Sequence, residues 1–88
     1  MPDARRYHHI SSAVISVIPG RMDFVLESVA RTEGVEIRGQ GNNRIVVVME
    51  GGSAGELGAA LTTLGALEGV VAANMVFEHI EELEGTEP

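Results

Sequence analysis

Three histidines and several glutamates are the residues of this chain whose types could support chemistry. His8 and His9 lie near the N-terminus, and His79 precedes Glu81 near the C-terminus. If the first and last strands pair antiparallel, His9 comes close to His79, and imidazole and carboxylate groups are ligands that zinc accepts. The residues have no fixed ligand spacing, however, and the chain has no cysteine. Histidines at strand ends are more often exposed to solvent, so the sequence predicts no metal site and no cofactor.

A catalytic constellation is also missing from the sequence. Enzymes bring together a nucleophile, a base and oxyanion donors, whereas the serines, Tyr7 and the glutamates follow no such pattern here. The glycine-rich segments GQGNN and EGGSAGE lack the lysine of a phosphate-binding loop. Turns and a helix cap explain these glycines better, and we predict a protein that is not an enzyme.

The charge of the chain excludes further classes. The net charge is −7, with six arginines and no lysine, and five of the glutamates lie in residues 78–88. Nucleic-acid binding needs a basic face, which this composition does not supply. No apolar run approaches the roughly 20 residues that cross a bilayer. The paired Arg5 and Arg6 are not followed by the clean apolar stretch of an export signal. We therefore expect a cytoplasmic protein without nucleic-acid binding or membrane insertion.

The elements that position these residues are predicted from hydrophobic periodicity. Residues 9–17 alternate with period two, as in a strand. Pro19 and Gly20 end this strand. The apolar residues that follow have helical spacing and predict a helix that ends near Gly34, with one apolar stripe: Met22, Val25, Leu26, Val29 and Ala30.

The second half of the chain repeats this arrangement. Residues 35–38 and 44–50 form a predicted hairpin around GQGNN, whose residues tolerate positive φ. Ser53 precedes Glu56 by three positions, which is the capping-box spacing at a helix start. This second helix is predicted to bury Leu57, Ala60, Leu61 and Leu64. The segments TEGVEI and LEGVVA place Val35 and Val70 at equivalent positions, each opening a strand.

The predicted order β-α-β-β-α-β indicates an α+β fold, the ferredoxin-like plait. In this fold a four-stranded antiparallel sheet carries two helices on one face, with spatial strand order 4-1-3-2. We expect the folded domain to span residues 9–80, with a flexible N-terminal arm at 1–8 and an acidic C-terminal tail at 81–88.

One face of this predicted sheet has no covering layer. The repeat predicts that Val70, Ala72 and Val76 face the helices, together with alternate residues of the other strands. The opposite face then shows apolar residues that usually mark an interaction site: Ile10, Ser12, Val14, Val46, Val48, Val71, Met75 and Phe77. An alternative is that a bulge in the last strand reverses its faces and the tail covers part of the sheet.

Five segments together resemble the NapD family of cytoplasmic chaperones for the periplasmic nitrate reductase. These segments are HISSAVISV at 9–17, the two EGV segments, NRIVVVMEG at 43–51 and VFEHIEE at 76–82. The similarity extends from His9 to about Glu82. His9 to Ser12 stand in the family's first-strand motif, and Val76, Phe77 and His79 stand in its last-strand motif.

The resemblance implies a protein that binds the twin-arginine signal peptide of the nitrate reductase catalytic subunit. Binding would delay export until the molybdenum cofactor is inserted, and the peptide would lie as a helix on the open face. The expected binding residues are Ile10, Ser12, Val14, Val46, Val48, Met75 and Phe77. The expected partners of the peptide arginines are Glu50, Glu78 and Glu81.

Two other interpretations stay open at this point. The turn VIPGR and the segment LEGV also resemble small effector-binding regulatory domains of the Lrp/AsnC and ACT kinds. Such domains bind a small molecule and dimerise through the sheet, so the open face would support self-association. A structural subunit covered by an unrelated partner is the third interpretation.

Overall fold

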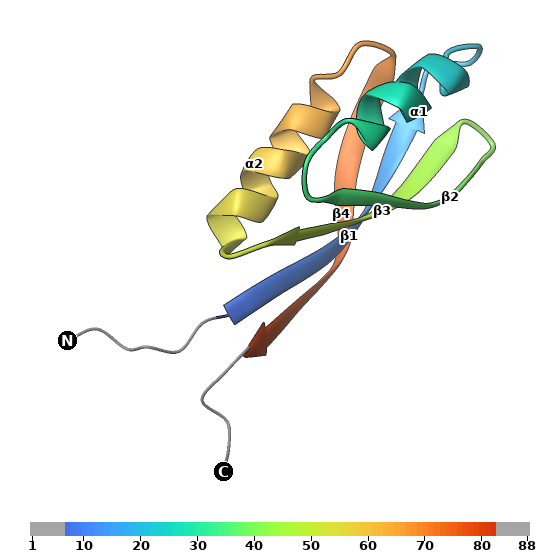
Figure 1. The fold of residues 1–88 in the computed structure, drawn as a ribbon. Helices are drawn as coiled ribbons and strands as arrows, with labels where there is room; N and C mark the ends of the chain where they lie inside the picture. Colours follow the sequence, from blue (N-terminus) through green and yellow to red (C-terminus); the bar gives the residue numbers. More distant parts are fainter. Residues whose placement is uncertain (1–6, 83–88) are drawn as a thin grey trace.

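The computed structural model describes the backbone of residues 7–82 and the side chains of residues 8–76. Four strands form one antiparallel sheet, and both helices cover the same face of it (Figure 1). The spatial order β2-β3-β1-β4 is the predicted order read from the other edge, so the ferredoxin-like α+β plait is confirmed. The elements are β1 (Tyr7–Val17), α1 (Met22–Ala30), β2 (Val35–Gly41), β3 (Arg44–Gly51), α2 (Ala54–Gly65) and β4 (Val70–Glu82).

The first and last strands along the chain, β1 and β4, are longer than predicted. β1 begins at Tyr7, and β4 continues to Glu82, where the two strands pair with each other. Tyr7 and His8 therefore belong to the sheet and not to an arm, and Glu81 and Glu82 belong to it and not to a tail. The rest of the predicted arm and tail, residues 1–6 and 83–88, lies outside the described residues.

Helix α1 buries the predicted stripe over most of its length. Val25 and Val29 are completely buried, whereas Ala30 is exposed, contrary to the prediction. The helix also ends at Ala30 and not near Gly34, because its last turn tightens. The N–H of Thr32 donates to the carbonyl of Val29, three residues earlier. Gly34 then adopts φ +78° and turns the chain into β2.

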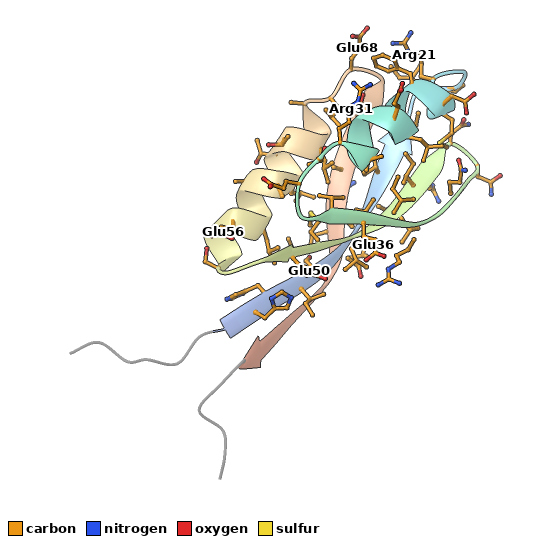
Figure 2. All side chains as sticks on the ribbon, viewed as in Figure 1. Arg21, Arg31, Glu36, Glu50, Glu56 and Glu68 are labelled. Atoms are coloured by element: carbon orange, nitrogen blue, oxygen red, sulfur yellow. The ribbon has the colours of Figure 1, made fainter. Side chains whose placement is uncertain are left out.

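Helix α2 begins with the predicted cap. The Ser53 hydroxyl accepts a hydrogen bond from the N–H of Glu56 at 3.2 Å. The Glu56 carboxylate accepts the N–H of Gly52 at 2.7 Å, one residue before the cap residue. Leu57 and Leu64 are completely buried, and Ala60 and Leu61 pack beside them, as predicted. Figure 2 shows Glu56 at the start of α2, while Arg21 and Glu68 lie together at the other end of the helical layer, 3.2 Å apart.

The core lies between the helices and one face of the sheet. On β1 and β3 the predicted helix-facing residues are all buried: Ser11, Ala13, Ile15, Val17, Ile45, Val47 and Met49. The hairpin between β2 and β3 turns at Asn42 and Asn43, with φ of +52° and +61°. Asparagine tolerates this conformation, as two-residue hairpin turns require. After this turn, the side chains of β3 keep the predicted alternation between buried and exposed positions.

Two bulges in β4 overturn part of the predicted alternation. Val70 lies opposite Val17 and Ala73 opposite Ile15, so two β4 residues match the single residue Ser16. Ala72 pairs with Ser16 and lies on the open face, whereas the repeat predicted that it faces the helices. A bulge inserts one extra residue and shifts the faces of all that follow.

The second bulge restores the predicted faces further along β4. Met75 lies opposite the buried Ala13, in a helix-side row, whereas the prediction placed it on the open face. Val76 is the extra residue and is 59% exposed, so the prediction that it faces the helices is wrong as well. After this second shift, Phe77 pairs with Ser12. The alternative of a bulge that reverses the strand is thus correct, but only over residues 72–75.

Candidate functional site

The candidate site is the face of the sheet opposite the helices, here called the open face. On β1 it carries Ile10, Ser12, Val14 and Ser16, which alternate with the buried residues of that strand. On β3 it carries Arg44, Val46, Val48 and Glu50, which pair with those four β1 residues in reverse order. Because residues directly opposite in an antiparallel pair share a face, these two strands build one continuous surface.

An apolar band crosses the middle of this surface. Val14 pairs with Val46, and Ser12 pairs with Val48, so three valines lie around one serine. Val46 is 40% exposed, and Val14 and Val48 are half-buried. No helix in the described part of the chain lies over this band (Figure 1). A sheet face of this kind, apolar and uncovered, is where a partner can bury surface.

Five of the seven predicted peptide-binding residues are brought together on the open face: Ile10, Ser12, Val14, Val46 and Val48. Met75 does not join them, because its position opposite Ala13 belongs to the helix side. It is nevertheless 37% exposed at the edge of the sheet. The backbone of Phe77 lies opposite Ser12, and its side chain is outside the described part of the chain.

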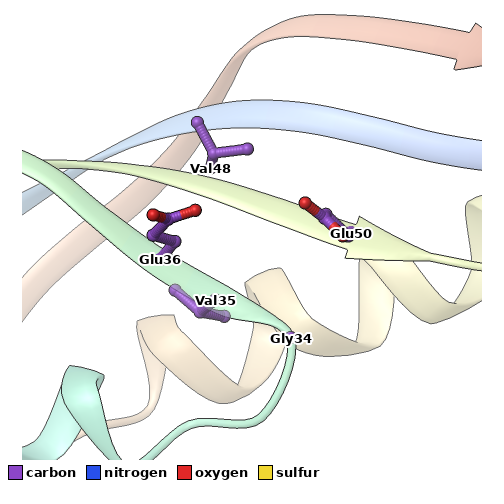
Figure 3. A pocket seen from close by; sticks show the side chains of 5 residues that line it. All are labelled: Gly34, Val35, Glu36, Val48 and Glu50. Carbon is purple, nitrogen blue, oxygen red and sulfur yellow. The ribbon is translucent and has the colours of Figure 1, made fainter.

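Acidic residues lie at one end of the apolar band. Glu36 of β2 pairs with Val48, and Glu50 follows Val48 by two positions on β3. Figure 3 shows the two carboxylates on either side of Val48, above the side of the sheet away from the helices. The hollow between them has a volume of about 230 Å³ and is lined by Gly34, Val35, Glu36, Val48 and Glu50.

Both carboxylates already have partners, which are exposed. The His8 Nε2 atom lies 3.2 Å from an oxygen of Glu50. The Arg38 guanidinium lies 3.5 Å from an oxygen of Glu36. The four side chains are between 28% and 63% exposed, so water screens both contacts and neither holds its carboxylate strongly. The carboxylates remain accessible to a further cation.

The three predicted partners of peptide arginines end in different places. Glu50 lies at the end of the open face. The backbone of Glu78 pairs with Ser11, in a row whose described members face the helices, and its side chain is outside the described part of the chain, so its role as an arginine partner stays a prediction. The backbone of Glu81 pairs with that of His8, whose side chain contacts Glu50. The side chain of Glu81 is outside the described part of the chain.

Glu36 is the site residue that sequence reasoning missed. The signal was present, because the segment VEIR alternates apolar and charged residues. Val35 and Ile37 pack against the core, which leaves Glu36 on the other face of β2. Its proximity to Glu50 follows from the hairpin register, and this register was not predicted residue by residue.

The opposite end of the open face is basic. Arg44 pairs with Ser16 at the end of the β1 and β3 ladder, six residues from Glu50 along β3. A shallow hollow of about 320 Å³ lies beside it, lined by Gly39, Gln40, Gly41, Asn42, Arg44 and Val46. The open face therefore runs from an acidic end, across valines, to a basic end.

The described residues offer neither a metal-binding group nor a membrane-spanning helix. Among the described side chains of residues 8–76, no three histidine, aspartate or glutamate side chains form a group that could hold a metal ion. Over the same range, neither helix has both the length and the apolar content of a bilayer-spanning segment.

Comparison with known proteins places this chain in a family. The model of the NapD protein family matches residues 8–82, which is most of the chain. The chaperone NapD of Paracoccus pantotrophus is 37% identical over 75 residues, covering 85% of this chain and 67% of that protein. The chain belongs to the NapD family. NapD proteins are chaperones, so the resemblance found in the sequence is confirmed.

A solved structure supports the fold of this NapD family member. The solution structure of the Escherichia coli Tat proofreading chaperone protein NapD superimposes with a TM-score of 0.75. The match covers 92% of this chain and 86% of that one at 22% identity. At this level of identity the comparison shows the shared fold, and the binding residues of this NapD chain must be argued from its own open face.

Proposed function

We propose that this chain binds the twin-arginine signal peptide of the periplasmic nitrate reductase catalytic subunit. It would hold the peptide in the cytoplasm, without catalysing a reaction, until the molybdenum cofactor is inserted. The observation that carries the proposal is the apolar band of the open face with carboxylates at one end. Signal peptides combine a basic segment with an apolar one, and these two features meet their complements on this surface.

The apolar segment of the peptide would supply most of the affinity. Burying apolar surface contributes roughly 25 cal/mol per Å² before the cost of ordering the peptide. Ile10, Val14, Val46 and Val48 offer such surface in one continuous patch. Phe77, opposite Ser12, is proposed to extend the patch onto β4, and Met75 to contribute only from the sheet edge.

The charged groups would mainly orient the peptide. Among the predicted partners of the peptide arginines, Glu50 is the one whose side chain is described on the open face. Glu36 lies near it, on the other side of Val48. Exposed ion pairs contribute about 0 to 1 kcal/mol each. The two carboxylates therefore add specificity for the arginine pair to an affinity that depends on apolar contact.

The test is a titration of the isotope-labelled protein with a synthetic nitrate reductase signal peptide, followed through backbone amide shifts. Saturable shifts concentrated on β1, β3 and the second half of β4 are expected. A peptide with both arginines replaced by glutamine serves as control and should bind more weakly. Unchanged spectra together with a stable dimer would reject the proposal and favour a regulatory domain that associates through its sheet.

A further inference from the structure

His8 and Glu50 make a contact on the open face whose strength depends on pH. The His8 Nε2 atom lies 3.2 Å from a carboxylate oxygen of Glu50. The two side chains come from neighbouring strands, because Glu50 pairs with Ile10 and His8 precedes Ile10 by two positions on β1. Histidine side chains change their charge between about pH 5 and about pH 8. The contact is therefore an ion pair when the ring is protonated and a contact with a neutral ring when it is not.

The other described charges at this end of the open face do not change over the same range. Glu36 and Arg38 of β2 form their own pair at 3.5 Å. Carboxylates and guanidinium groups in general keep their charges where histidine titrates. Together with His8 and Glu50 they carry a net charge of −1 when His8 is neutral, and no net charge when it is protonated. A single proton thus decides whether this acidic end attracts a cation.

Strand β4 adds two further titratable residues next to His8. The backbone of Glu81 pairs with that of His8, and the backbone of His79 pairs with that of Ile10. The side chains of His79 and Glu81 are outside the described part of the chain. A separate variant of His79 therefore has to distinguish the two histidines in any measurement of pH dependence.

We propose that a proton on His8 lowers the affinity of the open face for the signal peptide, so that the peptide binds more tightly as the pH rises. This regulation rests on the proposed function and adds control by pH to it. The protonated ring donates a charged hydrogen bond to Glu50 and competes with a peptide guanidinium for this carboxylate. The neutral ring leaves the negative charge of Glu50 uncompensated. Because the competition concerns one partly exposed ion pair, the expected change in affinity is about two- to fivefold.

The same competition has to act in the other direction. If the proton weakens peptide binding, the peptide weakens proton binding by the same factor. Peptide binding at about pH 6.5, where histidines titrate, should therefore release a fraction of a proton for each peptide bound. Calorimetric titration in two buffers of different ionisation enthalpy measures this number. Saturable binding without proton release would overturn the competition.

The decisive experiment compares peptide affinities at about pH 8 and about pH 6, on either side of histidine titration. The probe is an N-acetylated synthetic signal peptide in which any histidine is replaced by glutamine, so that the peptide itself does not titrate. Wild-type protein should bind it about two- to fivefold more weakly at the lower pH. His8→Gln carries no charge but can still donate a hydrogen bond to Glu50, and its affinity should change less than about 1.5-fold.

The controls separate His8 from its neighbours. His9→Gln changes the adjacent β1 residue, in the row that faces the helices, and should keep the wild-type pH dependence. His79→Gln should keep it as well. The peptide with both arginines replaced by glutamine should show a smaller pH effect in wild-type protein. Thermal unfolding at both pH values checks that each variant is folded.

The outcomes distinguish the regulation from the proposed function. Saturable binding of equal affinity at both pH values overturns the regulation by His8 while the proposed function stands. A pH dependence that persists in His8→Gln, or that disappears in His79→Gln alone, overturns it in the same way. If the peptide with both arginines does not bind saturably at either pH, the proposed function fails and the regulation fails with it.

Discussion

Val46 and Val47 are neighbours of the same residue type on β3, and they lie on opposite faces of the sheet. Val47 is completely buried under the helices, whereas Val46 is 40% exposed on the open face. The helix side carries the buried core, and the open face carries a smaller set of apolar side chains without a cover on β1 and β3: Ile10, Val14, Val46 and Val48. One strand can therefore stabilise the fold with one face and leave the other face available to a partner. Variants on the two faces should therefore separate these two properties.

The largest expected effect is the loss of stability from the covered face. Val47→Ala removes two methyl groups from the core and should lower the free energy of unfolding by about 2 to 3 kcal/mol. Val46→Ala, one residue away, should lower it by only about 0.5 kcal/mol or less. Urea denaturation followed by circular dichroism measures both. Equal losses would mean that the open face is also part of the stabilising core.

The next effect concerns binding through the open face. Val14→Asp places a carboxylate in the apolar band. It should lower the affinity for the signal peptide at least about tenfold, which corresponds to about 1.4 kcal/mol of binding free energy. Phe77→Ala should weaken it by a similar factor if that side chain extends the band. Calorimetric titration gives the affinities, and thermal unfolding checks that each variant folds. Deletion of residues 83–88 is the comparison and should change affinity little; an equal loss from this deletion would contradict the assignment.

A smaller effect is expected from the cap of α2. Ser53→Ala removes the hydroxyl that accepts the Glu56 N–H and should cost about 1 kcal/mol of stability. Peptide affinity should not change, because the cap lies in the helical layer. Ser28→Ala is a matched control, since that hydroxyl bonds a carbonyl within α1 and caps nothing. A loss of affinity without a loss of stability in Ser53→Ala would show that the helical layer also contacts the peptide.

The smallest expected effect is that of ionic strength on binding. Raising the sodium chloride concentration from about 50 to about 500 mM should lower the affinity for the signal peptide with both arginines about two- to fivefold, because salt screens exposed charges. The glutamine-substituted peptide should lose less. Fluorescence anisotropy at several salt concentrations measures the difference. A loss much larger than tenfold would indicate that charge, and not the apolar band, supplies most of the affinity.

The order of elements and the faces of β1 and β3 could be predicted from sequence, because both depend on local patterns. The alternation in residues 9–17 and the glycines at 34 and 69, both with positive φ, mark these elements clearly. The faces of β4 could not be predicted, since Val71 and Val76 look like ordinary strand residues. Only pairing with β1 makes them bulge residues, and pairing is a tertiary property.

The candidate site was predictable to a similar extent. The five open-face residues on β1 and β3 follow from alternation alone. Glu36 and Glu50 come together through the pairing register of the β2 and β3 hairpin. The sequence does not fix this register to within one residue. Met75 was misplaced for the same reason as Ala72, because both lie between the two bulges of β4.

The bulges also affect how well the edges of the sheet could pair with a strand from another molecule. Both outer strands of the sheet have irregular pairing, β2 between Ile37 and Gly39 and β4 at two places, while the central pair β1 and β3 is regular from His9 to Ser16. Outer strands with regular hydrogen-bonding groups can add strands from other molecules and aggregate, and bulges interrupt that template. Val71 and Val76 of β4 are exposed, so a regular edge strand at this place would be prone to aggregation. The irregular edges are therefore poorer templates for an added strand than regular edges would be.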